Sequence, residues 1–469
     1  MRSHRNVTGQ DSALPRSTPA EQGVDAAGID GFIAAVAPMP GVELHSLMVL
    51  RHGHVVAERW WRPYRPETAH LLYSLSKSFT STALGLAVGE GLVDLDATVL
   101  SYFPEYDRVV TDERSRSIRV RHVAAMASGH DDETFERALV AGDGDPLRGF
   151  LLIPPDREPG TVFAYNQPCT YAVSAIVQRV SGGSLTAYLR PRLYEPLGIA
   201  PFGWLTDARG RELGYSGLHV PTEAIARLGQ LYLRGGEWGG RRLLSAEWVA
   251  EATRAHVATV RPDPDWNQGY GFQFWRSRHG YRGDGAYGQL MVILPEADAV
   301  VAITSQSPDM QGLLDALWAH LLPALTAGAG PAGPWSPGSP ELSRPAPLGP
   351  AGDLNPATFR PGPGSEPAAL RTVRLRTVRP GAGELVLTGG GTELAVALGA
   401  PDTWTDSGPL ATAYAWAGGR LRVDVVFAET PHRLHLVLDP ATGRFESRWQ
   451  TVPLGEPAPE ALRMPGGGQ

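Results

Sequence analysis

The residue that most clearly points to chemistry is Lys77, the single lysine of the chain. The sequence has 469 residues and 42 lysine and arginine residues, and every one of these except Lys77 is an arginine. Lys77 lies three residues after Ser74, and an apolar helical stretch follows as far as Gly89-Glu90-Gly91. Positions i and i+3 of a helix lie on the same face, so the two side chains can touch.

A serine hydroxyl becomes a useful nucleophile when a neighbouring base takes its proton. An amine can be that base only when its pKa is lowered from about 10.4 towards neutrality, and burial lowers it. The shift costs about 4–5 kcal/mol, which a buried active site can hold. Arginine cannot replace lysine here, because its guanidinium does not deprotonate in proteins. The pattern therefore favours a Ser74–Lys77 catalytic pair, and the alternative is a leftover surface lysine.

The segment Ser74-Leu75-Ser76-Lys77 resembles the Ser-x-x-Lys motif of penicillin-recognising serine hydrolases, in particular the class C β-lactamase-like branch. The resemblance covers about residues 25–325. Other stretches that carry it are His45-Ser46-Leu47-Met48-Val49-Leu50, Ser76-Lys77-Ser78-Phe79-Thr80-Ser81, Pro159-Gly160-Thr161 and Leu228-Gly229-Gln230-Leu231-Tyr232. The resemblance implies an acyl-enzyme mechanism. Members of this branch include β-lactamases, carboxylesterases, aminopeptidases, amide-oligomer hydrolases, acyltransferases and peptide cyclases.

A second element of this family is a Tyr-x-Asn motif whose tyrosine helps to move the proton of the nucleophile. Tyr165 stands at that place, and the resemblance implies that it is the third catalytic residue. Gln167 occupies the position where the family has asparagine, with Asn166 between them. Either amide, Asn166 or Gln167, could face the substrate. The alternative is that Tyr165 is a core residue at the entry to a helix.

The third element is a Lys-Thr-Gly or His-x-Gly triplet on a strand that lines the site. The matching stretch is Gly283-Asp284-Gly285, so the cation of the triplet is missing, and Arg282 or His279 could compensate. We expect Asp284, Gly285 and Ala286 to contact substrate. The backbone N–H near Ala286, together with that of Ser74, could form an oxyanion hole. The alternative is a glycine-rich turn between two strands.

The order of the elements predicts an α+β fold, with one antiparallel sheet of about five strands flanked by helices. Two early strands and three late strands bracket a helical middle. These strands are expected at Ser46–Val49, Val55–Trp60, Tyr270–Trp275, Gln289–Leu294 and Ala299–Thr304. This is the β-lactamase/transpeptidase-like arrangement that the resemblance implies.

Composition divides the chain into five segments. Residues 1–24 are polar and predicted to be disordered, and the resemblance implies that 25–325 form a serine hydrolase domain. Residues 326–367 have the proline- and glycine-rich composition of a linker. Residues 368–455 alternate apolar and polar side chains, which predicts a small β-sandwich or barrel. Residues 456–469 are expected to be a loose tail.

The bulk composition excludes several classes of function. A net charge of −7 disfavours nucleic acid as a partner. No apolar run is long enough to span a membrane, and the N-terminus lacks the apolar core of a secretory signal, which predicts a cytoplasmic protein. A single cysteine rules out internal disulfides. No metal-ligand pattern appears, and no cofactor is expected. The oligomeric state stays open.

The sequence thus predicts a serine hydrolase that acts on a small-molecule or peptide-like ester or amide. Two alternatives remain. The same acyl-enzyme could pass its acyl group to an amine or alcohol, as in an acyltransferase or peptide cyclase. Alternatively, the departures from the family motifs at Gln167 and Gly283 could indicate a binding protein that has lost catalytic turnover.

Overall fold

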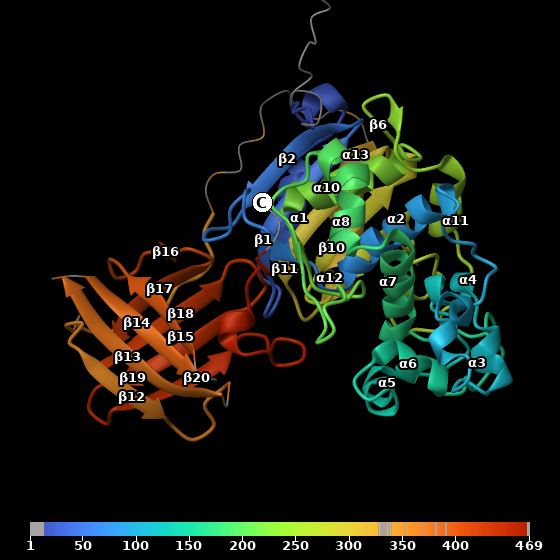
Figure 1. Cartoon of the computed structure of the whole chain (residues 1–469). Helices are drawn as coiled ribbons and strands as arrows, with labels where there is room; N and C mark the ends of the chain where they lie inside the picture. Colours follow the sequence, from blue (N-terminus) through green and yellow to red (C-terminus); the bar gives the residue numbers. More distant parts are fainter. Residues whose placement is uncertain are drawn as a thin grey trace, which may run out of the picture.

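The computed structural model describes residues 14–326, 328, 335, 338, 340–350, 352–367, 369–379, 382–389 and 392–466. Figure 1 shows an α+β part, coloured blue to yellow, and an all-β part, coloured orange to red, that packs beside it. The α+β part carries the Ser74 segment, so its sheet and helices are described first.

A six-stranded antiparallel sheet, ordered β2-β1-β11-β10-β9-β8, is the centre of the α+β part. Its strands are β1 Glu43–Arg51, β2 His54–Trp60, β8 Trp275–Arg276, β9 Tyr281–Gly285, β10 Gln289–Leu294 and β11 Ala299–Gln306. The turn between β1 and β2 consists of His52 and Gly53, with φ of 51° and 79°. Two positive φ angles match the twist of a two-residue hairpin. The predicted antiparallel sheet, which joins early and late strands, is confirmed.

Helices cover both faces of this sheet, which explains why its strands are apolar throughout. Successive side chains of a strand point to opposite faces. Leu47 and Val49 of β1 therefore enter the core that contains α1, α12 and α13, whereas Met48 and Leu50 enter the core that contains α2 and α10. Helices α3 to α7 lie together to one side of the sheet (Figure 1).

The helices of this part are α1 Ala26–Val36, α2 Ser76–Gly89, α3 Glu113–Ser117, α4 Val120–Ala124, α5 Phe135–Ala141, α6 Pro146–Leu152, α7 Gln167–Ser181, α8 Leu185–Leu189, α9 Glu195–Leu197, α10 Thr222–Leu233, α11 Ala246–Thr253, α12 Met310–Ala316 and α13 Leu322–Thr326. Short strand pairs complete it, namely β3 His70–Leu71 and β4 Gly203–Trp204, each paired with β5 Leu218–Val220, and β6 Glu237–Trp238 paired with β7 Arg241–Arg242. Within the described residues, no helix is both long enough and apolar enough to cross a membrane.

One expected strand differs from the structure. The run Tyr270–Trp275 was predicted as a strand, but Gln273 has a φ of 64°, which breaks an extended conformation. The chain instead forms β8 and β9 from Trp275 onward, and Tyr270 keeps only isolated bridges to Val257 and Trp275. The sheet therefore has six strands, with β9 beside β10.

The C-terminal part is a nine-stranded sheet ordered β15-β14-β13-β12-β20-β19-β18-β17-β16. Its strands are β12 Ala357–Pro361, β13 Leu370–Arg379, β14 Ala382–Gly389, β15 Thr392–Leu398, β16 Thr405–Ser407, β17 Leu410–Ala417, β18 Arg420–Phe427, β19 Arg433–Asp439 and β20 Arg444–Trp449. The two ends of the sheet meet, because Thr412 donates to the carbonyl of Ala397 and Ala397 donates to Ser407. The result is a nearly closed barrel around an apolar core, which confirms the predicted small all-β fold.

Three segments expected to be loose are packed in the structure. Residues 1–13 lie outside the described residues, but Leu14 is buried and Arg16 forms ion pairs of 3.0 Å with Glu58 and Glu223. Strand β12 lies inside the expected linker. In the expected tail, Leu462 packs in the barrel core. A composition rich in proline and glycine disfavours long regular elements, but it does not prevent such local contacts.

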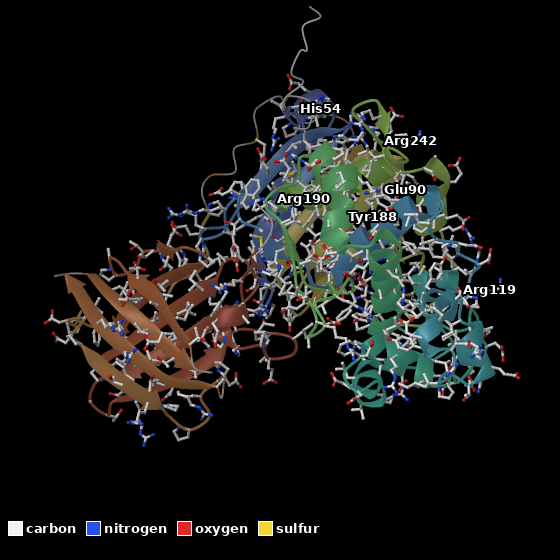
Figure 2. The ribbon with its side chains drawn as sticks, in the orientation of Figure 1. His54, Glu90, Arg119, Tyr188, Arg190 and Arg242 are labelled. Atoms are coloured by element: carbon white, nitrogen blue, oxygen red, sulfur yellow. The ribbon has the colours of Figure 1, made fainter. Side chains whose placement is uncertain are left out.

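Cations on the outer surface are arginines. Figure 2 labels Arg119, Arg190 and Arg242 on the outside of the α+β part, and Arg119 and Arg242 are exposed. Lys77, by contrast, is 1% exposed. The single lysine is therefore a core residue, and it needs partners for its amine.

Candidate active site

Ser74 lies in a tight turn that leads directly into a buried helix. Tyr73–Leu75 forms a single 3-10 turn, and α2 starts at Ser76. Nζ of Lys77 lies 2.9 Å from Oγ of Ser74. The contact predicted from the i, i+3 spacing is thus present, although Ser74 precedes the regular α-helix rather than lying in its first turn.

Two further acceptors surround the amine of Lys77. Nζ lies 2.7 Å from Oε1 of Gln167 and 2.8 Å from the carbonyl oxygen of Tyr215. Burial lowers the pKa of Lys77 to about 7, and the carboxylates of Glu133 and Asp284 oppose this shift. A neutral amine has two N–H bonds and one lone pair. It can donate to Gln167 and Tyr215 and still accept the proton of Ser74.

Tyr165 lies on the other side of the same amine. Nζ of Lys77 is 4.8 Å from the centre of the Tyr165 ring, which stacks on Trp275 at 5.5 Å. Burial raises the pKa of Tyr165, and a hydrogen bond with Ser74 opposes the rise. Tyr165 is therefore a neutral phenol at ordinary pH, and it can relay a proton more readily than it can act as the primary base.

Strand β9 brings the glycine-rich stretch against the nucleophile. A Cβ atom at Gly283 would lie 2.4 Å from Oγ of Ser78, and one at Gly285 would lie 2.0 Å from the carbonyl oxygen of Leu72. Only glycine allows this close approach of the strand to the turn. Asp284, between the two glycines, lines the cavity. The alternative of a simple turn at Gly283–Gly285 is excluded, because these residues belong to β9.

The two residues expected to replace the missing triplet cation do not line the cavity. Arg282 is fully buried and donates from Nε to Asp284 at 3.0 Å. Its guanidinium lies 4.3 Å from the ring centre of Trp266. Burial raises the pKa of Asp284, and the charge of Arg282 opposes that rise. His279 packs its ring on Trp318 at 5.0 Å, away from the nucleophile.

Of the two candidate amides, Gln167 lines the cavity and Asn166 does not. Oδ1 of Asn166 accepts hydrogen bonds of 3.0 Å from the backbone N–H and the hydroxyl of Thr134. Asn166 is fully buried. Its side chain therefore ties the start of α7 to the segment before α5, and the expected contact of Asn166 with substrate has no support from its position.

A cavity of about 750 Å³ opens over Ser74. Its walls are Ser74, Tyr165, Gln167, Arg261, Pro262, Asp263, Trp266, Trp275, Asp284, Gly285, Ala286, Tyr287, Ser307, Pro308, Asp309, Met310, Gln311 and Leu454. The volume falls within the range of small-molecule sites. Among the predicted site residues, Ser74, Tyr165, Gln167, Asp284, Gly285 and Ala286 meet here, and Lys77 lies behind Ser74.

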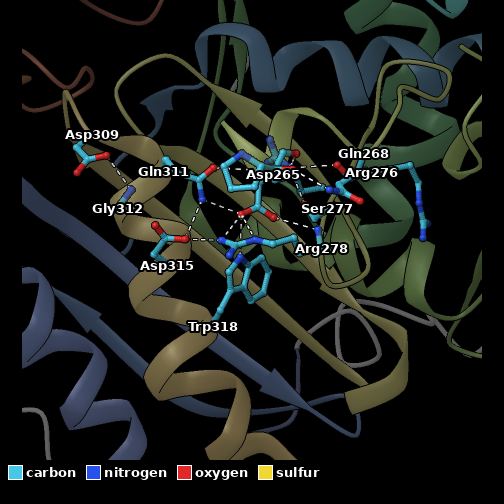
Figure 3. Close-up of polar contacts among 12 residues, drawn as sticks. Asp265, Gln268, Arg276, Ser277, Arg278, Asp309, Gln311, Gly312, Asp315 and Trp318 are labelled. Atoms are coloured by element: carbon cyan, nitrogen blue, oxygen red, sulfur yellow. Dashed lines mark hydrogen bonds and ion pairs between the residues drawn. The ribbon is translucent and has the colours of Figure 1, made fainter. Parts of the chain in front are cut away.

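Two walls of the cavity are held together by the buried carboxylate of Asp265 (Figure 3). Oδ2 of Asp265 accepts hydrogen bonds from Nη2 of Arg278 at 2.6 Å, Nε2 of Gln311 at 2.8 Å and Nε1 of Trp318 at 3.0 Å. Burial alone would raise the pKa of Asp265, but these donors lower it to about 2. Asp265 precedes Trp266 in the chain, so it anchors the Trp266 wall to α12.

The sequence profile of the β-lactamase family matches residues 30–325. That range contains the nucleophile turn, Tyr165 and β9. The chain belongs to the β-lactamase family.

Relatives in the β-lactamase family include named hydrolases. A 6-aminohexanoate-dimer hydrolase of Paenarthrobacter ureafaciens is 27% identical over 286 residues, which cover 56% of this chain and 73% of that protein. The esterase EstB of Burkholderia gladioli is 26% identical over 182 residues, 34% of this chain and 46% of the esterase. The match thus spans less than half of EstB.

The fold is shared with a penicillin-binding protein homologue from Caulobacter crescentus. The two structures superpose with a TM-score of 0.51 at 20% identity, covering 63% of this chain and 97% of the other. This likeness shows the fold of the α+β part, and it is consistent with the β-lactamase/transpeptidase-like arrangement predicted from the sequence.

Several residues around the site were missed by sequence reasoning. Tyr215 contributes a backbone carbonyl, which any residue could supply. Both carboxylate oxygens of Glu133 accept from the backbone N–H of Gln167, at 3.0 and 3.2 Å. Tyr287 and Leu454 also line the cavity, and Leu454 comes from the C-terminal part. The family motifs around Ser74, Tyr165 and Gly283 carry no signal for these four residues.

The polar stretch His130–Glu133 forms a loop before α5. In the structure, Nδ1 of His130 contacts Oγ of Ser128 at 2.9 Å and Nε2 contacts the carbonyl of Ile153 at 3.0 Å. Across the residues that the structure describes, no three or more His, Cys, Asp or Glu side chains gather in a way that could hold a metal ion.

Proposed function

We propose that the protein hydrolyses a small ester or amide through an acyl-enzyme formed on Ser74. The observation that carries this proposal is the amine of Lys77, 1% exposed and 2.9 Å from Oγ of Ser74. Its pKa of about 7 makes a substantial fraction of the amine neutral at physiological pH. A base is most effective when its pKa lies near the working pH.

In the first half of the reaction, Oγ of Ser74 forms a bond to the carbonyl carbon while its proton passes to Nζ of Lys77. The backbone N–H groups of Ser74 and Ala286 then stabilise the negative oxygen of the tetrahedral intermediate. Such donors contribute about 10²–10³-fold to the rate. When the intermediate collapses, the bond to the leaving group breaks, and the leaving atom takes the proton back from Lys77 by way of Tyr165.

In the second half, water attacks the acyl group and gives its proton to the same base. The bond between the acyl carbon and Oγ breaks, and Ser74 recovers its proton. Gln167 and the carbonyl of Tyr215 hold the amine of Lys77 in place throughout. The raised pKa of Tyr165 supports its role as a neutral relay, since a phenolate there is disfavoured.

The charges of the cavity support an ester or amide without a carboxylate close to the scissile bond. The walls contain one cation, Arg261, and three carboxylates, Asp263, Asp284 and Asp309. A penicillin-like carboxylate would meet net negative charge, and Gly283 offers no cation. Trp266, Trp275 and Met310 instead provide apolar contact area. We therefore favour an esterase or amidase over an efficient β-lactamase.

A fluorophosphonate probe followed by mass spectrometry of the peptide around Ser74 tests this proposal. We expect a covalent adduct on Ser74 in the wild type and none in Ser74→Ala. Hydrolysis of nitrophenyl esters and nitroanilides should exceed that of a chromogenic β-lactam. An intact wild-type protein that forms no adduct would indicate a binding homologue and would overturn the proposal.

Acyl transfer is a second candidate, because the apolar walls around Trp266, Trp275, Met310 and Leu454 can seat an apolar acceptor beside the acyl group. The acyl-enzyme is the same in both reactions. Product analysis in the presence of an added amine or alcohol separates them. Transfer product that outweighs the free acid at modest acceptor concentration would favour the transferase.

A further inference from the structure

Each proposed oxyanion donor adjoins a tyrosine with a left-handed backbone. Tyr73, directly before Ser74, has a φ of 48°, and Tyr287, directly after Ala286, has a φ of 66°. Bulky side chains rarely occupy this region. Such a conformation persists only where the surrounding structure fixes it, and it is common at functional sites. Contacts of the Tyr73 and Tyr287 side chains must therefore hold the backbone in this conformation.

The hydroxyl of Tyr73 is fixed by a histidine of the C-terminal barrel. Oη of Tyr73 lies 2.5 Å from Nε2 of His432. Nδ1 of the same ring lies 3.0 Å from the carbonyl oxygen of Thr451. A carbonyl can only accept, so Nδ1 carries the proton and Nε2 is the acceptor for the hydroxyl of Tyr73. Burial lowers the pKa of His432 to about 4, which keeps the ring neutral.

The hydroxyl of Tyr287 is fixed by the same region of the barrel part. It donates to the carbonyl oxygen of Val452 at 2.7 Å. The three rings also pack edge to face, with centres 5.4 Å apart for Tyr73 and Tyr287 and 5.4 Å for Tyr287 and His432. Such aromatic pairs have preferred geometries that restrict ring movement. One block of barrel residues thus holds both tyrosines.

We infer that His432 and the Thr451–Val452 backbone are positioning elements of the oxyanion hole, which act through Tyr73 and Tyr287 on the N–H groups of Ser74 and Ala286. This inference rests on the proposed acyl-enzyme function. The C-terminal barrel then contributes to catalysis, because its residues hold the turn that carries Ser74 in the α+β part. None of these barrel residues touches the reacting atoms.

If the contacts between the barrel and Tyr73 only stabilised the fold, their loss would lower Tm but not kcat. Variants that remove single polar groups distinguish this role from the positioning role. Tyr73→Phe removes one oxygen atom and leaves the ring. Tyr414→Phe is the matched control, because its hydroxyl donates to the carbonyl of Gly399 at 3.1 Å inside the barrel. His432→Gln keeps one acceptor and one donor, whereas His432→Leu keeps neither.

The experiment measures kcat, KM, the rate of fluorophosphonate labelling and Tm for each variant of the full chain. We expect Tyr73→Phe and His432→Leu to lower kcat and the labelling rate about tenfold or more, with KM within about twofold, since small displacements of reacting groups are costly. His432→Gln should recover part of the loss. Tyr414→Phe should lower Tm by a similar amount as Tyr73→Phe without changing kcat.

The inference is overturned if Tyr73→Phe labels and turns over as fast as the wild type. A loss of kcat in Tyr414→Phe equal to that in Tyr73→Phe also overturns it, because the effect would then be general destabilisation. If His432→Leu does not fold, the kcat and labelling rate of Tyr73→Phe alone test the inference. A wild type that takes no label overturns the proposed function itself, whereas a labelled wild type with equally fast variants overturns only this inference.

Discussion

Oε1 of Gln167 lies 2.7 Å from Nζ of Lys77 and occupies the place where the family motif has an asparagine. The longer side chain of glutamine starts at the first residue of α7 and still reaches the amine behind the nucleophile. The glutamine at this position of the motif therefore forms a hydrogen bond with the amine of Lys77. The amine has three partners at 2.7–2.9 Å, and in its neutral state it can donate to Gln167 and Tyr215 and keep a lone pair for the proton of Ser74.

The first prediction concerns the pH dependence of kcat/KM. Only the neutral amine can accept the proton of Ser74, and the pKa of Lys77 is about 7. We expect kcat/KM for an uncharged ester to rise with pH through about 7 and then to level off. Lys77→Arg should lose activity, because its guanidinium stays charged. A fully active Lys77→Arg protein would contradict the proposed base.

The second prediction concerns stability. The folded pKa of Lys77 is about 7 and the ordinary value is 10.5, so the unfolded state holds the proton more tightly. The buried amine therefore destabilises the fold most below pH 7, and the penalty falls as the pH rises to 10.5. Lys77→Met removes it. The gain in unfolding free energy should be about 2–3 kcal/mol larger at pH 6 than at pH 9.

Denaturant titrations at the two pH values check this expectation. Ser74→Ala is the control, because it also abolishes turnover but keeps the amine. It should show no comparable pH-dependent gain. If Lys77→Met changes stability equally at both pH values, the amine does not titrate near neutrality in the folded protein.

The third prediction concerns the effect of residue 167 on the pKa of Lys77. Gln167→Glu places a negative charge at 2.7 Å from the amine without changing the size of the side chain. A nearby opposite charge favours the protonated amine, so the midpoint of the kcat/KM profile should move up by about one unit or more. Gln178→Glu, on the same helix and away from the cavity, should leave the midpoint unchanged. An unmoved midpoint in Gln167→Glu would show that Gln167 does not contact the base.

The fourth prediction concerns the wall of the cavity. Asp265→Asn removes the negative charge that accepts hydrogen bonds from Arg278, Gln311 and Trp318. We expect the unfolding free energy to fall by about 2–4 kcal/mol. This range is below that for a fully buried ion pair, because solvent screens the partly exposed Arg278. We expect the loss of these bonds to displace Trp266, so KM should rise more than kcat falls. The native pKa of Asp265 is about 2 against an ordinary 3.8, so its contribution is present above pH 3.8 and is lost as the pH falls towards 2.

Asp315→Asn is the matched control, because Asp315 pairs with the same arginine but is 54% exposed. Exposed ion pairs contribute about 0–1 kcal/mol, so this variant should stay close to the wild type in both stability and KM. Equal losses in the two variants would show that burial of Asp265 is not what matters.

Sequence reasoning succeeded where local geometry decides the outcome. The contact of Ser74 with Lys77 follows from helical spacing, and the early and late strands of the sheet follow from short apolar runs. It was less successful where packing chooses between neighbours. Asn166 and Gln167 are adjacent amides, and only the placement of α7 against Thr134 determines that Gln167 faces the lysine.

Contacts between distant parts of the chain left no local signal. His432 and Leu454 belong to an alternating β pattern and to a segment expected to form part of the barrel, and neither position suggests a neighbour near residue 74. The run Tyr270–Trp275 is apolar enough for a strand, but the left-handed Gln273 interrupts it. Tertiary packing determines both the contacts near residue 74 and the interruption of the predicted strand.

The walls around Ser74 come from segments that are far apart in the sequence, since Leu454 lines the same cavity. Synthesis proceeds from the N-terminus, and domains fold as they emerge. The nucleophile turn is therefore translated well before the residues that brace and close it. The cavity over Ser74 can therefore be completed only after the segment that contains Leu454 has been translated.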